Sequence, residues 1–159
     1  MKKLLVIGLL LMVITAPVVA QHKSFQTLEA HFKGQEEVHS FRVSGFLCRM
    51  VLGMAGEWEF RKAIEDVKHI RLMVIPGYEF QAQNLTAGGF KKVIQQDGFE
   101  ELATIRDGND YISLYVHNKG NKNYTYFVWV EEPEEVVAIE LKGYINPSIL
   151  TDQNTFSRK

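Results

Sequence analysis

The chain has 159 residues, with 18 basic and 19 acidic side chains, so its formal net charge is only −1. Without an excess of Lys and Arg, we expect no nucleic-acid partner. The length suits a single domain with its own core, and Cys48 is the only cysteine, so no intramolecular disulfide can form.

The first twenty residues carry the three parts of a secretory signal peptide. Two lysines at 2–3 precede an apolar run at 4–16, and small residues at 18–20 fit a signal peptidase. A membrane anchor is the alternative, but Pro17 ends the run before the roughly 18–20 residues that a spanning helix needs. We therefore predict cleavage after Ala20 and an exported product, periplasmic or secreted, with no stable membrane insertion after cleavage.

We predict a single α+β domain over residues 21–150 and a polar C-terminal tail over 151–159. The domain begins with a short amphipathic helix, because apolar residues recur at helical spacing before a glycine, namely Phe25, Leu28 and Phe32 before Gly34. A short strand is expected at 38–43. A helix that is apolar on nearly every side follows around 46–54, and it contains Cys48, for which we expect a buried and unreactive thiol.

The middle of the chain combines one clear strand with a second helix. Residues 67–75 alternate, with Ile70, Leu72 and Val74 on one face and His69, Arg71 and Met73 on the other. After the Pro76-Gly77 turn, a helix is expected to begin near Asn84 or Thr86 and to end at Gly98. Its inward residues are predicted to be Phe90, Val93 and Ile94.

From residue 99 onward the period changes to two, with turn signals at 107–109, 118–121 and 131–134. Successive hairpins then join four antiparallel strands. Two sets of residues are predicted to point inward, Ile112, Leu114 and Val116 on one strand and Val137, Ile139 and Leu141 on another. We expect an α+β two-layer sandwich, mainly an antiparallel sheet with a late β-meander and two to three helices on one face. Where strand 67–75 inserts is left open.

The second half resembles a known family. The resemblance rests on turns and strand patterns at 98–102, 106–108, 112–116, 136–139 and 141–145. These look like a Bacteroidetes-type family of secreted domains of unknown function, numbered 4252, and the similarity spans roughly residues 24–150. It implies the fold, carries over no catalytic residues, and implies a link to envelope regulation near extracytoplasmic sigma factors.

Motifs for catalysis, metals or cofactors are weak. The five histidines never fall at metal-ligand spacing, although His69 and His117 are both predicted on the outward sheet face, where they could converge. Clustered glutamates at 131–135 lack the pattern of a calcium loop, and Gly88-Gly89 lacks the lysine of a phosphate loop. No Gly-x-Ser-x-Gly elbow is present. We predict no catalytic residues, no metal and no cofactor.

Aromatic side chains are the strongest functional signal. On 124–131 they occupy both faces, and one layer of helices can bury only one of them. We predict an outward binding surface with tentative binding residues Arg71, Tyr115, His117, Phe127 and Trp129. The alternative is that these aromatics pair across strands and support the sheet.

The resulting hypothesis is an exported, non-enzymatic binding or interaction module of the bacterial envelope, whose partner is an envelope protein or a small ligand. One alternative is a small hydrolase using His69 or His117 with a nearby carboxylate, which requires a concave pocket. Another is a structural envelope component. The sequence leaves the oligomeric state open.

Overall fold

The structure is a computed structural model that describes residues 23–56 and 58–146. The predicted signal peptide at 1–20 and the predicted tail at 151–159 lie outside the described residues. The elements in chain order are α2 (Ser24–Phe32), β1 (His39–Ser44), α3 (Gly45–Met54), α4 (Trp58–Ala63), β2 (Asp66–Pro76), α5 (Gly77–Ala82), α6 (Ala87–Gln96), β3 (Glu100–Asp107), β4 (Asp110–Asn118), β5 (Tyr124–Glu131) and β6 (Glu135–Tyr144).

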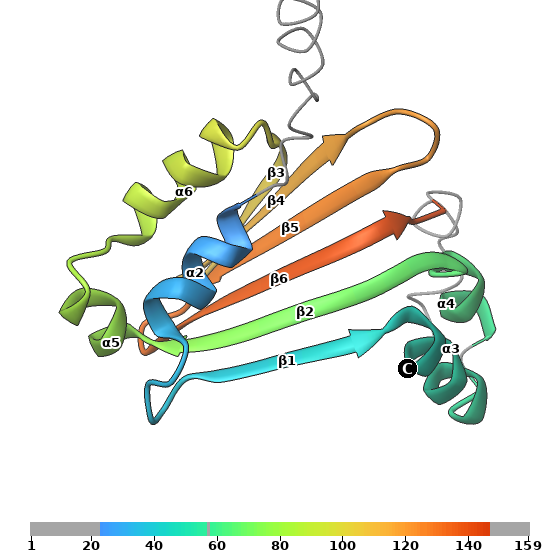
Figure 1. The fold of residues 1–159 in the computed structure, drawn as a ribbon, viewed down its shortest axis with the longest axis horizontal. Helices are drawn as coiled ribbons and strands as arrows, with labels where there is room; N and C mark the ends of the chain where they lie inside the picture. Colours follow the sequence, from blue (N-terminus) through green and yellow to red (C-terminus); the bar gives the residue numbers. More distant parts are fainter. Residues whose placement is uncertain (1–22, 57, 147–159) are drawn as a thin grey trace, which may run out of the picture.

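The strands form one six-stranded antiparallel sheet in the order β1-β2-β6-β5-β4-β3. Strands β3 to β6 are the predicted meander, and β2 inserts between β1 and β6, which settles the position that the sequence left open. Helix α2 crosses in front of the sheet, and α5 and α6 lie beside it (Figure 1). The predicted α+β sandwich is therefore confirmed.

Helices α2, α5 and α6 pack on one face of the sheet through a single hydrophobic cluster. Helix α2 contributes Phe25, Leu28 and Phe32, the residues whose spacing predicted it. Helix α6 is capped by the Thr86 hydroxyl, which accepts a hydrogen bond from the Gly89 N–H at 3.0 Å. The helices share an aromatic core with the sheet, in which Phe90 stacks on Trp129 with ring centroids 4.9 Å apart.

The predicted orientation of the late strands is wrong. The residues that meet the helices are Ser113, Tyr115, Phe127, Trp129 and Ala138, which are fully buried. Those predicted to point inward, Ile112, Leu114, Val116, Val137, Ile139 and Leu141, are only half-buried on the opposite face. Both faces of these strands are apolar, so alternation alone could not choose between them, and the larger aromatic side chains fill the space under the helices.

Helix α3 lies at the end of the sheet and contacts β1 and β2. Gly45 is needed there, because a Cβ at this position would lie 1.8 Å from the Val67 carbonyl oxygen. Five apolar side chains of α3 are exposed, with Met54 at 83% and Phe46 at 66%. Cys48 is half-buried rather than buried, since none of the described layers covers this helix on its outer side. Within the described residues, no helix is both long and apolar enough to cross a membrane.

Candidate functional site

A buried ion pair lies between the sheet and α2. Glu140 on β6 is completely buried, and its register partner Arg71 on β2 is 5% exposed. The Arg71 guanidinium donates two hydrogen bonds to Glu140 Oε1, from Nε at 3.0 Å and from Nη2 at 2.8 Å. Its Nη1 donates a third, at 3.3 Å, to Oε2 of Glu29 on α2. The Phe25 ring packs 4.4 Å from the guanidinium carbon. Arg71 is therefore held on three sides.

More cations than carboxylates surround this pair. Arg42 on β1 is the register partner of Arg71, and its Nη2 lies 3.7 Å from Glu29 Oε1. Lys142 on β6 places Nζ 3.6 Å from Glu140 Oε1. Three cations, Arg42, Arg71 and Lys142, thus share the two carboxylates of Glu29 and Glu140. The surplus positive charge faces solvent, because the Arg42 side chain is 67% exposed.

His69 on β2 completes the group. Partial burial is the largest cause that lowers its pKa below the ordinary value, and the positive charges of Lys142, Arg71 and Arg42 act in the same direction. Only Glu140 opposes them. The imidazole is consequently favoured in its neutral form near neutral pH, and an anion bound beside it would shift this balance toward imidazolium.

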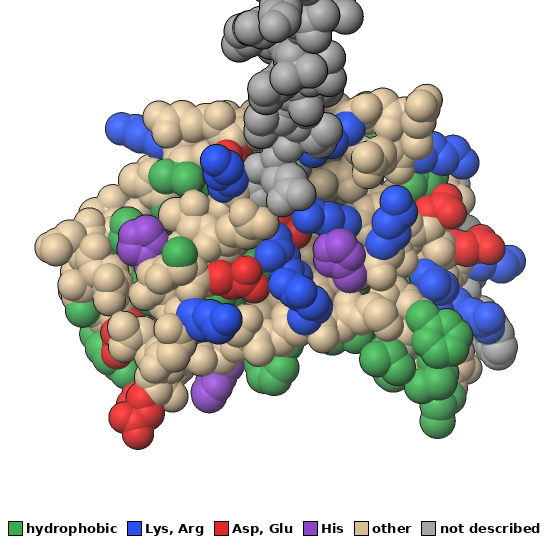
Figure 2. Space-filling view, viewed as in Figure 1, with side chains coloured by type: hydrophobic (Ala, Val, Ile, Leu, Met, Phe, Trp, Pro, Cys, Tyr) green, Lys and Arg blue, Asp and Glu red, His purple; other side chains and the backbone are tan. Residues whose placement is uncertain are grey.

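These side chains line a pocket of about 350 Å³ formed by Gln26, Arg42, Ser44, His69, Arg71 and Lys142. We call it the cationic pocket. Every lining side chain carries a hydrogen-bond donor and none is a carboxylate. Figure 2 shows Lys and Arg side chains gathered around a histidine near the middle of the helix-bearing face. Such a lining is suited to a carboxylate or a phosphate group.

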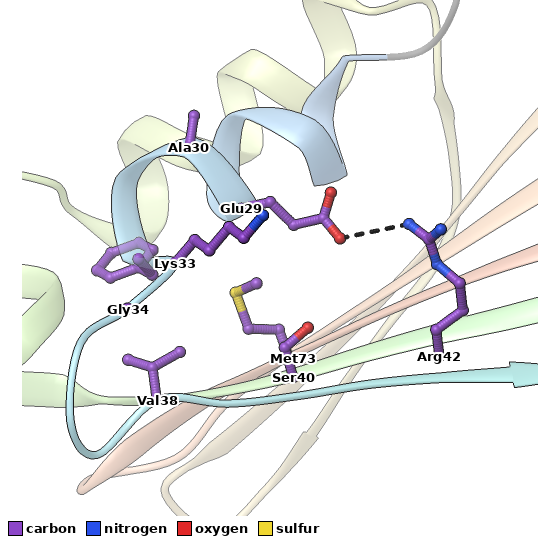
Figure 3. Close-up of a pocket in the computed structure, with 9 residues that line it drawn as sticks. Glu29, Ala30, Lys33, Gly34, Val38, Ser40, Arg42 and Met73 are labelled. Carbon is purple, nitrogen blue, oxygen red and sulfur yellow. Dashed lines mark ion pairs between the residues drawn. The ribbon is translucent and has the colours of Figure 1, made fainter.

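A second hollow of about 370 Å³ adjoins the cationic pocket and shares Arg42 with it. It lies between α2 and β1 and is more apolar, with Val38 and Met73 on its floor. Figure 3 shows the Glu29 carboxylate reaching from α2 across this hollow toward Arg42. Glu29 therefore lines the second hollow and pairs with the arginine that both pockets share.

Three of the five predicted binding residues lie in the core. Tyr115, Phe127 and Trp129 are fully buried under the helices, so the exposed aromatic surface predicted for them is wrong. Phe127 lies between Phe25 of α2 and Phe99, at centroid distances of 6.3 Å and 5.8 Å. Their buried positions agree with the alternative interpretation, in which the aromatic side chains support the sheet.

The remaining two predicted residues are not brought together. Arg71 lies in the cationic pocket, whereas the Nδ1 atom of His117 is 2.7 Å from the Gly98 carbonyl oxygen. His69 and His117 are on β2 and β4, which β6 and β5 separate, so three strand spacings of about 4.8 Å keep them apart. The described residues hold no group of three or more potential metal ligands.

Sequence reasoning missed four contributors to the site, namely Glu29, Arg42, Glu140 and Lys142. A signal for two of them existed. On β6, Val136, Ala138, Glu140 and Lys142 share a face by alternation, so a lone acid followed by a lone base interrupts an apolar series. On a face predicted to meet solvent, two charged side chains are ordinary and do not indicate a site.

The fold and this pocket define a two-layer α+β domain with a cationic cleft beside its N-terminal helix. The family described as "Domain of unknown function (DUF4252)" matches residues 32–152, which is most of the chain. The protein belongs to this family. No curated protein and no solved structure matches the sequence.

Proposed function

We propose that the protein is an exported, non-enzymatic binding module of the bacterial envelope that takes an anionic group in the cationic pocket. The observation that carries this proposal is the lining itself, which has six donor side chains and no carboxylate. An anion there would gain charge-assisted hydrogen bonds from Arg42 and Lys142, whose ion pairs with Glu29 and Glu140 are long. The pocket would admit a phosphate or a carboxylate on a small molecule or at the end of a polymer.

The surrounding contacts support a preformed site. Arg71 is held in place by Glu140 and Glu29, so its position costs little entropy when a ligand arrives. Arg42 and Lys142 make only long ion pairs, at 3.7 Å and 3.6 Å, and both have donors to spare. These two flexible cations would close on the ligand, while Arg71 sets the charge behind it.

The contacts favour binding over hydrolysis. Ser44 is the hydroxyl nearest in register to His69, but its Oγ accepts a hydrogen bond from the Leu47 N–H at 3.3 Å and caps α3. Among the described residues, no hydrogen bond joins His69 to Ser44 or to Glu140. Nucleophilic catalysis needs a base in hydrogen-bond reach of its nucleophile and a carboxylate that orients the base.

Binding is tested by titrating the purified protein with inorganic phosphate, acetate and neutral glucose at low salt, while the His69 ring resonances are followed by NMR. Phosphate or acetate should raise the pKa of His69, and glucose should not. The double variant Arg42→Gln/Lys142→Gln should weaken binding at least about tenfold, since it removes two charge-assisted donors. Lys92→Gln on the exposed surface of α6 is the matched control.

Anionic phospholipid vesicles, added in a separate titration, distinguish a free anion from a membrane-borne one. If neither phosphate nor acetate perturbs His69 in the folded protein, the pocket is not an anion site and the proposal fails. Export is tested separately by sequencing the N-terminus of the protein from an envelope fraction, where the first residue should be Gln21.

A further inference from the structure

The sheet face opposite the helices is apolar across all four central strands. Its side chains form three rows, and each row takes one residue from β2, β6, β5 and β4 in register. We call this surface the uncovered face. Its rows are Val74, Val137, Val130 and Ile112; then Leu72, Ile139, Val128 and Leu114; then Ile70, Leu141, Tyr126 and Val116. None of the residues in these three rows belongs to the hydrophobic cluster that joins the described helices to the sheet.

The edge strands extend the same surface. Phe41 on β1 and Ile105 on β3 are each 57% exposed, and they continue the rows by register with Leu72 and Ile112. Six strands about 4.8 Å apart and five residues of about 3.4 Å give a face of roughly 30 Å by 17 Å. Two such faces in contact bury about 1,000 Å² in projection, which reaches the lower limit for a specific protein interface.

The chemistry of the face selects its occupant. No charged side chain lies in the three central rows, so a polar or charged partner would lose hydration there without compensation. A flat array of Val, Ile and Leu packs well against a second array of the same kind, as in two sheets stacked about 10 Å apart. A second copy of this chain supplies that array at equal size.

Charges at the two ends of the strands fix how the copies would face each other. The β3–β4 turn carries Asp107 and Asp110, and the β5–β6 turn at the same end carries Glu132 and Glu134. The β4–β5 turn, at the opposite end, carries Lys119 and Lys122. A two-fold axis that runs across the strands brings the lysine turn of one copy over the acidic turns of the other, whereas an axis along the strands brings acid over acid.

We propose that two copies of the chain associate face to face through the uncovered face, about a two-fold axis that runs across the strands. The axis passes near Val128 and Ile139, which are register partners on the two innermost strands, β5 and β6. Each sheet would then be covered on both sides, by helices on one and by its twin on the other. The cationic pocket lies on the helix-bearing side and stays open in such a dimer.

Sedimentation equilibrium of the protein purified from cells that express the full chain tests the association. We expect about twice the monomer mass at micromolar concentration. Val128→Lys should give a monomer, because the lysines of the two copies would meet at the axis and repel each other. Its circular dichroism should match that of the parent protein. Val128→Thr is milder and should weaken the dimer at least about tenfold, which covers the case that the lysine variant does not fold. Lys92→Glu on α6 is the control and should remain dimeric.

Cysteine cross-linking and charge exchange test the orientation. In a Cys48→Ser background, Val128→Cys should form a disulfide-linked dimer. When the Val130→Cys and Tyr126→Cys variants are mixed, a disulfide should join one copy of each, because the proposed axis places these two positions opposite each other. Lys119→Glu/Lys122→Glu should weaken association, and adding Asp110→Lys/Glu132→Lys to that variant should restore it.

A monomeric parent protein at all concentrations overturns the proposal. So does a dimer that survives Val128→Lys with unchanged affinity, since that outcome assigns association to an edge strand or to α3. Cross-linking between Val130→Cys and Val137→Cys, in place of Val130→Cys and Tyr126→Cys, would overturn the proposed axis.

Discussion

The two faces of the sheet are both apolar, but they differ in the shape of their side chains. The covered face presents Tyr115, Phe127 and Trp129, which interlock with phenylalanines from three helices. The uncovered face presents rows of Val, Ile and Leu that are half-buried by their neighbours alone. Rings project far enough to fill the space between a sheet and helices, whereas short branched side chains form a flat surface. Side-chain shape therefore distinguishes the two faces where hydrophobicity does not.

The covered face also contains the charged group, and the uncovered face does not. Arg71 and Glu140 lie beside aromatic rings under α2, where burial makes their mutual contacts costly to break. Three sets of substitutions and one labelling experiment probe this contrast and the exposed helix α3, in order of decreasing expected effect.

Trp129→Ala should lower the free energy of unfolding by about 3–5 kcal/mol, because it empties a large volume between the sheet and α6. Val128→Ala, its neighbour on the uncovered face, should cost clearly less in the monomer. Urea denaturation at a concentration where the protein is monomeric measures both. Equal costs would contradict the assignment of the two faces.

Arg71→Met should destabilise the fold by about 3 kcal/mol, because it leaves the Glu140 carboxylate buried without its main partner. The double variant Arg71→Met/Glu140→Leu should recover most of that loss, since neither charge remains. Thermal unfolding of the two variants measures the difference. A double variant as unstable as the single one would mean that Arg71 acts through Glu29 and Phe25 instead.

His69 should make the free energy of unfolding depend on pH. Its pKa is lowered in the folded state, so between that value and the unfolded value of about 6.5 the unfolded chain binds more protons. The stability that depends on neutral His69 is therefore complete above about pH 6.5 and is lost as the pH falls through the lowered pKa of the folded state. His69→Gln should flatten the slope in this window, and an unchanged slope would assign it to other groups.

Cys48 should react with a thiol reagent at a measurable rate in the native protein, because α3 is exposed and the thiol is only half-buried. This prediction replaces the unreactive thiol expected from its apolar neighbours. A control in denaturant gives the fully accessible rate. Native labelling that requires global unfolding would show that α3 is covered, and its exposed apolar side chains at the lower right of Figure 2 would then be the contact.

The aromatic residues illustrate how far the site could be predicted. Their spacing placed Tyr115, Phe127 and Trp129 correctly on one face together with Arg71, and only the side that meets the helices was reversed. The cationic pocket needed more, because its side chains come from α2, β1, β2 and β6. No short motif encodes a set whose members lie more than a hundred residues apart in the sequence.

Local sequence patterns predicted helices α2, α3 and α6, the six strands and the late meander, because periodicity and turn residues act over a few neighbouring positions. They did not predict the short helices α4 and α5. Tertiary structure alone decided which face of the sheet the helices cover, where β2 inserts, and which charges meet. Those outcomes depend on packing volume and on contacts between distant segments, such as Arg71 with Glu140 and Glu29. For this protein, local patterns define the sheet, and among the described residues long-range packing places the helices and the cationic pocket on one side of it.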